Sequence, residues 1–445
     1  MSTQLPNTIA GLLACLRSGE LSIAEAITCQ RNRFNELDAG LHATTYADGN
    51  DQSNVSCIED FGSRPLAAVG LAHKDIFTLN GRQAGLGRGE AAQCVNDSTE
   101  TLVQAPVLTR LADAGALNLG ALTMAEDACA ATAQTRHQPI PVNPLGRDIA
   151  VGGSSSGSAV AVASGMVYAS LGTDTAGSVR IPAMTCGVMG LKTTHGLMDQ
   201  QGMAPLCPSL DSIGVLARSV ADLGDVVQVL APELAACAQV PKAAFWFDES
   251  VLDEAIAPLV SQAMQRYADR QVDVADLEAR AASWQEVIMT YEVGQTHRAR
   301  IADGSACAQV QGLGRTGLAM PETWWQLALA DRKPCLQAFI DKAFAHADVL
   351  LAPLQVDALP KADEVYVGHP AFTPAKLLGL HHYCGWVNYL GLPALSLPVG
   401  FDKQGLPVSL QLIGRPFAER QLLALGQQIQ TDIYGEQGIM PVLRI

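Results

Sequence analysis

The chain has 445 residues, a net charge of −15 and 48% hydrophobic residues, which is enough apolar material for a large buried core. The acidic balance argues against nucleic acid or an anionic membrane as a partner, because both attract basic surfaces. The first 20 residues do not follow the signal-peptide pattern, and no apolar run has the length of a membrane span. We therefore expect a cytoplasmic protein.

The eleven cysteines are scattered along the chain, and none of them forms a CxxC pair. This distribution argues against a disulfide framework and against a structural zinc site, so no metal is expected. The sequence has no internal repeat, low-complexity tail or linker. It therefore favours one continuous domain over residues 1–445.

The N-terminal part alternates helical and strand patterns. Ser22 and Glu25 form a capping-box pattern at a helix start. A lysine, Lys74, ends a predicted strand, where it either extends to water or is held neutral for chemistry. The predicted helices cover Thr8–Arg17, Ser22–Leu37 and Leu102–Ala114, and the predicted strands cover Pro65–Asp75 and Leu117–Leu122.

Two turns rich in glycine and serine dominate the middle of the chain. The first is Gly152–Ser158, followed by a buried helix through Ala159–Ala163 and a strand-like piece at Met166–Leu171. The second turn is Gly172–Ser178. Because one helix separates them, the two turns can lie at the same end of a sheet. Glycine leaves backbone amides uncovered, so such turns suit the stabilisation of anions.

The rest of the chain is predicted to be helical and then strand-rich. Residues 232–345 have polar helical patterns, three tryptophans that more simply pack in a core than carry a substrate, and one glycine-rich turn, Gly312–Gly317. The other predicted elements are a helix over Ser219–Leu230, strands over Asp348–Pro353, Leu395–Val399 and Val408–Ile413, and a last helix over Glu419–Thr431.

Three chemistries compete for the central turns. Gly153–Gly157 fits the nucleophile elbow G-x-S-x-G with Ser155 as nucleophile, but the later histidines offer no obvious partner. A phosphate-binding Walker loop is excluded, because no lysine occurs between Val151 and Leu191. The third chemistry needs a nucleophilic serine, a bridging serine and a lysine base.

The motifs that carry the third chemistry are GGSSSGSA at 152–159, GTDTAGSVRIPA at 172–183 and CGVMGLK at 186–192, with Lys74-Asp75 upstream and Ser209-Leu210-Asp211 downstream. In these segments the chain resembles the amidase signature family, and the resemblance runs from about residue 10 to 430. It implies an α/β fold with a mixed, twisted central sheet flanked by helices on both faces. The catalytic core would cover about 60–230 and 345–430, with 232–345 as a more variable helical cap that helps to form the pocket.

The resemblance also implies roles for single residues. Ser178 would be the nucleophile, Ser154 the bridging serine and Lys74 the base, with a cis peptide bond between Gly153 and Ser154. The remaining roles are an oxyanion hole from the backbone amides of Thr175, Ala176, Gly177 and Ser178, and supporting side chains at Ser155, Asp174 and Arg180.

The chain departs from the family pattern at three positions. Ala176 stands where many members have glycine, so a left-handed backbone there would be strained. Thr193 replaces a proline, and Ile181 stands where the A-type chains of tRNA-dependent amidotransferases usually have glutamine. The last difference argues against an amidotransferase.

We therefore expect a hydrolase that cleaves a linear C–N bond through an acyl-enzyme, without metal or cofactor. The expected substrate is a small neutral aryl or acyl amide, or a carbamate (urethane). Other expected partners exclude nucleic acid and membrane and leave room for a homodimer. Pocket walls are expected from Met124–Cys129, Gly202–Leu206, Trp324–Leu329 and Ala371–Trp386. The alternatives are the A-type chain of an amidotransferase, an esterase of the α/β-hydrolase kind that uses Ser155, and a binding protein whose chemistry has lapsed.

Overall fold

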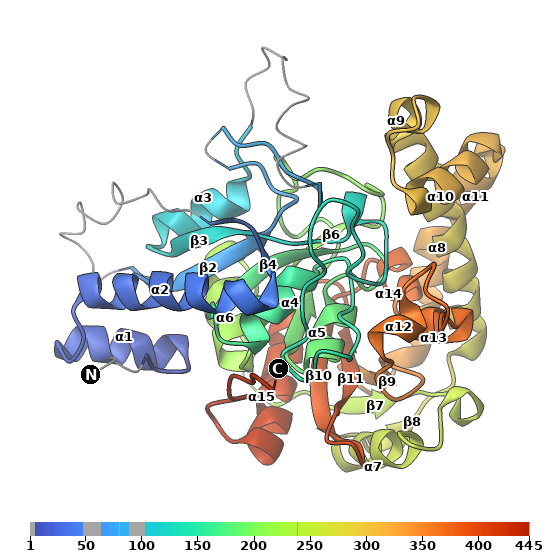
Figure 1. Ribbon diagram of the computed structural model, residues 1–445. Coiled ribbons are helices and arrows are strands. Elements are labelled where there is room, and N and C mark those ends of the chain that lie inside the picture. Colours follow the sequence, from blue (N-terminus) through green and yellow to red (C-terminus); the bar gives the residue numbers. More distant parts are fainter. Residues whose placement is uncertain (1–4, 48–63, 80, 89–102, 238, 445) are drawn as a thin grey trace.

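A computed structural model describes residues 5–47, 64–79, 81–88, 103–237 and 239–444. In this part of the chain, eleven strands form one sheet in the order β1-β3-β2-β4-β6-β5-β10-β11-β9-β7-β8 (Figure 1). The strands are β1 (Thr44–Ala47), β2 (Gly70–Lys74), β3 (Leu117–Leu122), β4 (Ala169–Asp174), β5 (Met189–Lys192), β6 (Ser212–Ala217), β7 (Ala243–Phe245), β8 (Arg270–Gln271), β9 (Val349–Pro353), β10 (Ala394–Phe401) and β11 (Pro407–Gly414).

The sheet is mixed, as predicted. Strand β2 runs parallel to both of its neighbours, β3 and β4, and β7 runs parallel to β8 and β9. The strands between these two groups pair antiparallel, from β4 through β6, β5, β10 and β11 to β9. The three parallel strands β3, β2 and β4 therefore present their carboxyl ends at one edge of the sheet.

Helices cover both faces of the sheet (Figure 1). The helices are α1 (Ile9–Ser18), α2 (Ile23–Leu41), α3 (Pro106–Asp113), α4 (Ser156–Ala163), α5 (Arg180–Cys186), α6 (Val220–Leu230), α7 (Ala257–Tyr267), α8 (Ala275–Thr296), α9 (Arg298–Ala302), α10 (Ala308–Ala319), α11 (Glu322–Ala343), α12 (Ala362–Val365), α13 (Pro374–Gly379), α14 (Gly385–Tyr389) and α15 (Glu419–Tyr434), with short 3-10 helices η3 (Glu126–Ala128) and η4 (Glu249–Val251).

The two faces of the sheet carry separate hydrophobic cores, because successive side chains of a strand point to opposite faces. On β2, Leu71 belongs to the core under α6 and α15, whereas Ala72 belongs to the core under α4 and α5. On β6, Val215 and Leu216 divide in the same way. Strands that are buried on both sides read as continuous apolar runs, and this is why the sequence signal was strong.

Helix α4 is buried all round because small residues allow it to approach its neighbours closely. A Cβ atom added at Gly157 would lie 2.3 Å from the carbonyl oxygen of Ala43 and 2.6 Å from the amide nitrogen of Thr123. The amide of Gly157 instead donates to the carbonyl of Thr123 at 2.8 Å. This contact fixes the start of α4, which follows directly after the first serine-rich turn.

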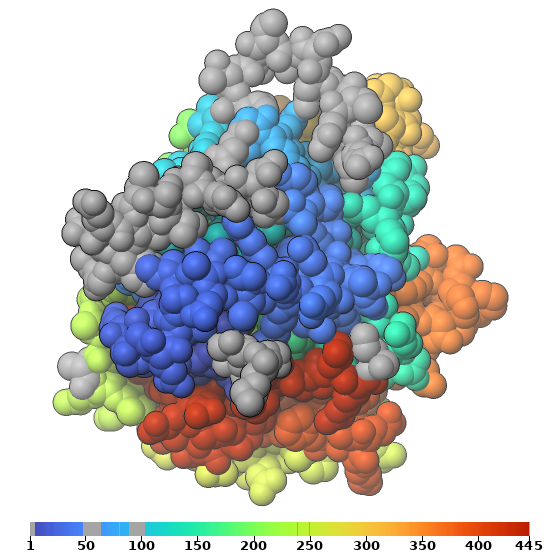
Figure 2. All heavy atoms as spheres, turned by 60° about the vertical axis from the view of Figure 1, so that its left-hand side comes forward, coloured from blue at the N-terminus to red at the C-terminus, as the bar shows by residue number. Residues whose placement is uncertain are grey.

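The N-terminal helices lie against the C-terminal segment, as the neighbouring blue and red surfaces of Figure 2 show. The Nδ2 atom of Asn7 donates to the Met440 sulfur at 3.3 Å. The predicted capping box at Ser22 and Glu25 is confirmed at the start of α2.

The predicted turn at Gly312–Gly317 is wrong, because these residues lie inside α10. Their glycines serve close packing instead. A Cβ atom at Gly317 would lie 1.9 Å from the carbonyl oxygen of Thr290 on α8, and Gly314 faces Gly294 of the same helix. The segment 232–345 also contains the short strands β7 and β8, which its polar helical pattern did not predict.

Candidate active site

Lys74 lies at the carboxyl end of β2 and is completely buried. Its Nζ atom donates to the Ser154 hydroxyl at 2.8 Å and to the Thr173 hydroxyl at 2.7 Å. Thr173 lies near the carboxyl end of β4, and parallel β2 and β4 end at the same edge, so the fold brings these residues together. Burial lowers the pKa of Lys74 to about 7, although Asp211 and Asp174 oppose this shift.

Ser154 lies in the first serine-rich turn, and the Gly153–Ser154 peptide bond is cis, as the resemblance implies. The turn is bound on both sides of this bond. The amide of Gly153 donates to the carbonyl of Ala131 at 2.9 Å, and the carbonyl of Ser154 accepts from the amide of Ala125 at 3.1 Å. Ser154 is fully buried, so its hydroxyl faces Lys74 and not the solvent.

Ser178 lies in the second turn, just before α5. The two turns meet where the amide of Ser155 donates to the carbonyl of Ser178 at 3.1 Å. Ser178 retains 8% exposure, whereas Lys74 and Ser154 are at 0%. Of the three residues, Ser178 is thus the one that a substrate can reach.

The backbone of the second turn is relaxed at Ala176. The left-handed conformation falls on Gly177, with φ 116°, and Ala176 is not among the residues with positive φ. The strain predicted for Ala176 is therefore absent. The amide of Gly177 already donates to the Asp174 carboxylate at 2.8 Å. This bond argues against Gly177 as an oxyanion donor and leaves the amides of Thr175, Ala176 and Ser178 as candidates.

Asp174 and Arg180 form a completely buried ion pair that braces this turn. Asp174 accepts from the amides of Val179 and Arg180 at 3.2 and 3.3 Å, and so it caps α5. Burial alone raises the pKa of Asp174, but the Arg180 charge and hydrogen bonds outweigh it and hold that pKa well below its usual range. Arg180 also donates to Gln411 at 2.9 Å and to Asn388 at 2.7 Å.

The hydroxyl of Ser155 points into the fold. It donates to the carbonyl of Thr173 at 3.3 Å, accepts from the amide of Thr173 at 3.4 Å, and has 0% exposure. A nucleophile elbow requires an exposed serine hydroxyl with a base beside it. The geometry therefore favours a supporting role for Ser155 and argues against an esterase that uses it.

Three further residues of the site were given no role from the sequence. Asp211 accepts from the Thr175 hydroxyl at 2.6 Å, and burial raises its pKa to about 6. Asn388 donates to the Asp174 carboxylate at 2.9 Å, and Gln411 holds Arg180. Asp211 and Gln411 lie in segments that match the family, which is a usable signal, whereas Asn388 lies on α14 outside any recognised motif.

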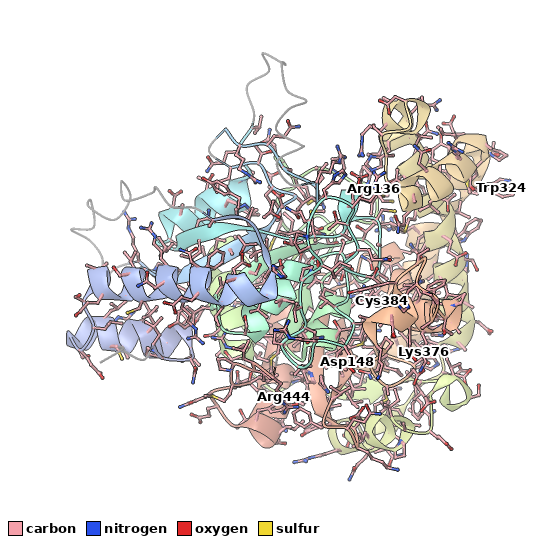
Figure 3. The ribbon with its side chains drawn as sticks, viewed as in Figure 1. Arg136, Asp148, Trp324, Lys376, Cys384 and Arg444 are labelled. Carbon is pink, nitrogen blue, oxygen red and sulfur yellow. The ribbon has the colours of Figure 1, made fainter. Side chains whose placement is uncertain are left out.

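The expected pocket walls divide into two groups. Ala125 adjoins Ser154, and Cys384 on α14 would lie 2.8 Å from a Cβ atom at Gly177. Trp324, in contrast, is 53% exposed at the outer end of the helical region, far from Cys384 in Figure 3. Trp324 thus contributes neither to the core nor to the site. Trp325 is half buried and stacks on Tyr291, with 5.2 Å between the ring centroids.

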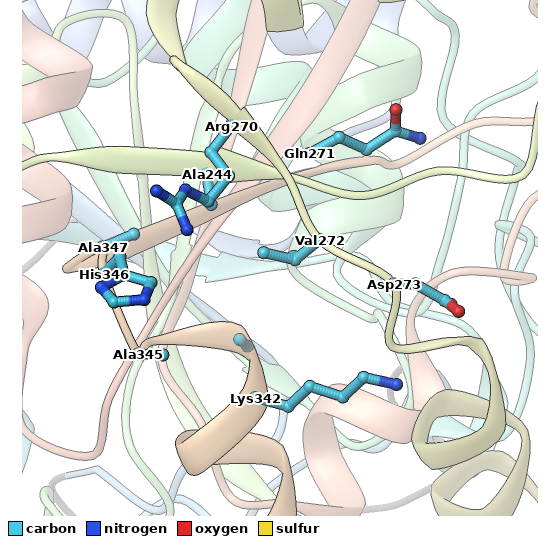
Figure 4. Close-up of a pocket in the computed structure, with 10 residues that line it drawn as sticks. Ala244, Arg270, Gln271, Val272, Asp273, Lys342, Ala345, His346 and Ala347 are labelled. Atoms are coloured by element: carbon cyan, nitrogen blue, oxygen red, sulfur yellow. The ribbon is translucent and has the colours of Figure 1, made fainter.

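Two cavities lie apart from these residues. One of about 200 Å³ adjoins β8 and the end of α11, where Arg270, Lys342 and His346 line it (Figure 4). Another of about 310 Å³ adjoins Met184 and Leu380. In the described residues, no cluster of three or more His, Cys, Asp or Glu side chains is placed to hold a metal ion. Within the same ranges, no helix combines the length and the apolar character that a membrane span needs.

Known proteins resemble this chain over nearly its whole length. The A-type chain of the glutamyl-tRNA(Gln) amidotransferase of Lachnoclostridium phytofermentans is 28% identical over 94% of this chain and 96% of its own. A structure described as an amidase has a TM-score of 0.82 and 26% identity, covering 96% of this chain and 100% of its own. An inhibitor-bound vestigial protein complex, described as revealing the origins of an s-triazine catabolic enzyme, has the same TM-score and identity and covers 97% and 100%.

These relatives correct the expectation about partners. A small-molecule substrate without nucleic acid, membrane or any protein partner except a second copy was predicted, largely from the net charge of −15. The relatives include components of a tRNA amidotransferase and of a protein complex, so that prediction is wrong. Net charge sums over the whole surface and cannot exclude a local protein interface, or a role in a complex whose other chains contact RNA.

A family model described as Amidase matches residues 61–253 and 255–423, which is most of the chain. The matched region contains both serine-rich turns, the lysine at the end of β2 and the sheet that brings them together. The chain therefore belongs to the amidase signature family.

Proposed function

We propose that the chain hydrolyses an amide C–N bond through an acyl-enzyme, with Ser178 as nucleophile, Ser154 as bridging serine and Lys74 as base. The buried hydrogen bond of 2.8 Å from Lys74 to Ser154 carries the proposal. A serine hydroxyl is a weak nucleophile until a base removes its proton, and a lysine can act as that base only when it is neutral. The pKa of about 7 makes neutral Lys74 available near physiological pH.

The proposed reaction moves one proton out and back. Lys74 takes the proton of Ser154, Ser154 takes that of Ser178, and the Ser178 oxygen attacks the carbonyl carbon. Backbone amides of the second turn stabilise the oxyanion, and each such donor typically lowers the barrier by about 3–4 kcal/mol. The proton returns through Ser154 to the leaving nitrogen as the C–N bond breaks. Water then hydrolyses the ester on Ser178.

The first candidate substrate is a primary amide that supplies ammonia within a protein complex. The relatives named as A-type chains of glutamyl-tRNA(Gln) amidotransferases support it, because they align along more than nine-tenths of the chain. Hydrolysis of a primary amide at Ser178 would release ammonia, which is the group that an amidotransferase passes on.

The second candidate is a neutral amide or a carbamate, with an apolar acyl group. Its support is Ile181, which stands where the A-type chains of amidotransferases usually have glutamine. The Ile181 side chain would lie 2.7 Å from a Cβ atom at Gly177, and Cys384 would lie 2.8 Å from the same atom. The residues that flank this side of the turn are therefore apolar or weakly polar.

A panel of amides separates the two candidates. We expect ammonia release from at least one of L-glutamine, L-asparagine, propionamide, benzamide and phenyl carbamate, measured in an enzyme-coupled assay with the Ser178→Ala variant as blank. Preference for the amino-acid amides supports the first candidate, and preference for the neutral compounds supports the second. Neither turnover nor a covalent adduct on Ser178 with any of them would contradict the proposal.

The activity should rise with pH through the pKa of Lys74. The pKa of Lys74 is lowered from 10.5 to about 7, so the neutral base is scarce at pH 6 and predominates at pH 8. We expect kcat/KM to rise about tenfold over this interval and then to level off. Lys192 has a similarly lowered pKa of about 7, so the residual activity of a Lys74→Ala variant is the control. A step near pH 7 that persists in this variant would exclude Lys74 as its origin.

A further inference from the structure

The turn Cys207–Asp211 connects the helical region of residues 275–343 to the second serine-rich turn. On its inner side, the Asp211 carboxylate accepts from the amides of Leu206 and Cys207 at 2.9 and 3.0 Å. Its other oxygen accepts from the Thr175 hydroxyl at 2.6 Å. Thr175 is the first residue of the proposed oxyanion hole, so the position of this turn bears directly on that site.

A second carboxylate, Glu292 on α8, holds the same turn from its outer side. One oxygen of Glu292 accepts from the amide of Ser209 at 2.9 Å and from the Cys207 thiol at 3.2 Å. The other oxygen accepts from the Ser209 hydroxyl and from the Trp325 indole, the latter at 2.9 Å. All four donors converge on a residue with 8% exposure, which is a costly arrangement for a side chain that only fills space.

Helix α11 completes this grip. Arg332 donates to the carbonyl of Ser209 at 2.8 Å and to the carbonyl of Asn388 at 3.2 Å. Both polar groups of the Ser209 backbone are thus bound by side chains from the helical region. The side chain of Asn388 reaches the Asp174 carboxylate, so the contacts of α8 and α11 converge on the catalytic turn from two directions.

We propose that Glu292 is a positioning residue for the oxyanion hole, acting through the Cys207–Asp211 turn and the Asp211–Thr175 hydrogen bond. This inference rests on the proposed function. Oxyanion donors must lie within about 0.5 Å of their productive position, and Thr175 depends on Asp211 for its own. The helical region, distant along the chain, therefore tunes the rate of the chemical step and not the binding of substrate.

The test is the Glu292→Gln variant. The substitution keeps the volume of the side chain but turns one of its two oxygens into a donor that faces two donors. We expect kcat to fall about 10- to 30-fold while KM stays within about threefold, because transition-state stabilisation is lost and ground-state binding is not. The matched control is Arg280→Met, which breaks an exposed ion pair between Arg280 and Asp331 of the same two helices without touching Ser209. This control should stay within about twofold of wild-type activity.

A double-mutant cycle tests the route. Thr175→Val removes the hydroxyl that Asp211 accepts. If Glu292 acts through this bond, Glu292→Gln should lower kcat less than about threefold in the Thr175→Val background. An undiminished loss in that background, or an unchanged kcat in Glu292→Gln alone, would overturn the proposal.

Hydrogen exchange measured by mass spectrometry gives a readout that does not depend on catalysis. In Glu292→Gln we expect faster exchange in peptides that span residues 172–179 and 205–212, and no change there in Arg280→Met. Unchanged exchange in these peptides would contradict the coupling even if the chain proved to be an amidase. Faster exchange in a chain without amidase activity would instead place the failure in the proposed function.

Discussion

Replacing Ser178 by alanine should abolish amide hydrolysis, with a fall in kcat/KM of at least about 10⁴-fold, or roughly 5.5 kcal/mol of barrier. The variant lacks the oxygen that forms the acyl-enzyme, and no neighbouring hydroxyl can take its place. The Ser154 hydroxyl is held by Lys74, and the Ser155 hydroxyl is bonded to the backbone of β4. Intact-mass spectrometry of quenched reactions should show an acyl adduct on wild-type protein and none on the variant.

The matched control is Ser155→Ala, a similar change one residue after Ser154. Because the Ser155 hydroxyl only bonds to Thr173, we expect this variant to keep at least about a tenth of wild-type activity. The reverse pattern, an active Ser178→Ala and an inactive Ser155→Ala, would establish the nucleophile elbow in place of the proposed triad.

Replacing Lys74 by methionine should lower kcat/KM by about 10³- to 10⁴-fold, because the variant keeps most of the side-chain volume but has no base. The Ser154 hydroxyl would then lose the partner that accepts its proton. Thermal unfolding should accompany the assay, so that loss of the base is separated from loss of the fold. Activity above about 1% of wild type in a folded variant would rule out Lys74 as the general base.

Lys192 provides an unusually close control for Lys74. Both lysines are completely buried at the end of a strand, and burial lowers the pKa of both to about 7. Lys192, however, donates only to the carbonyls of Thr193 and Leu392, at 2.9 and 2.8 Å. We expect Lys192→Met to lower the unfolding temperature while kcat/KM changes by less than about tenfold. Equal losses of activity in both variants would mean that burial of charge, and not base catalysis, explains the effect at Lys74.

The fold and family could be predicted from sequence because their signals are local. The apolar runs of Leu117–Leu122 and Asp348–Pro353 marked strands that the structure confirms at Leu117–Leu122 and Val349–Pro353. The glycine- and serine-rich turns were recognisable because their conformations and close contacts restrict which residues can stand there. Gly312–Gly317 was misread for the same reason. A glycine cluster signals close approach of a backbone, but it does not say whether a turn or a helix crossing requires it.

What the sequence determined by itself was the family, the mixed sheet and the set of chemical groups: two serines and a buried lysine. What only the tertiary structure decided was how those groups are oriented and supported. The engagement of the Gly177 amide by Asp174, the support of Thr175 by Asp211 and the grip of Glu292 on Ser209 join residues that are 3, 36 and 83 positions apart. Hydrogen-bond geometry between distant segments depends on packing, and a single sequence carries no local pattern that records it.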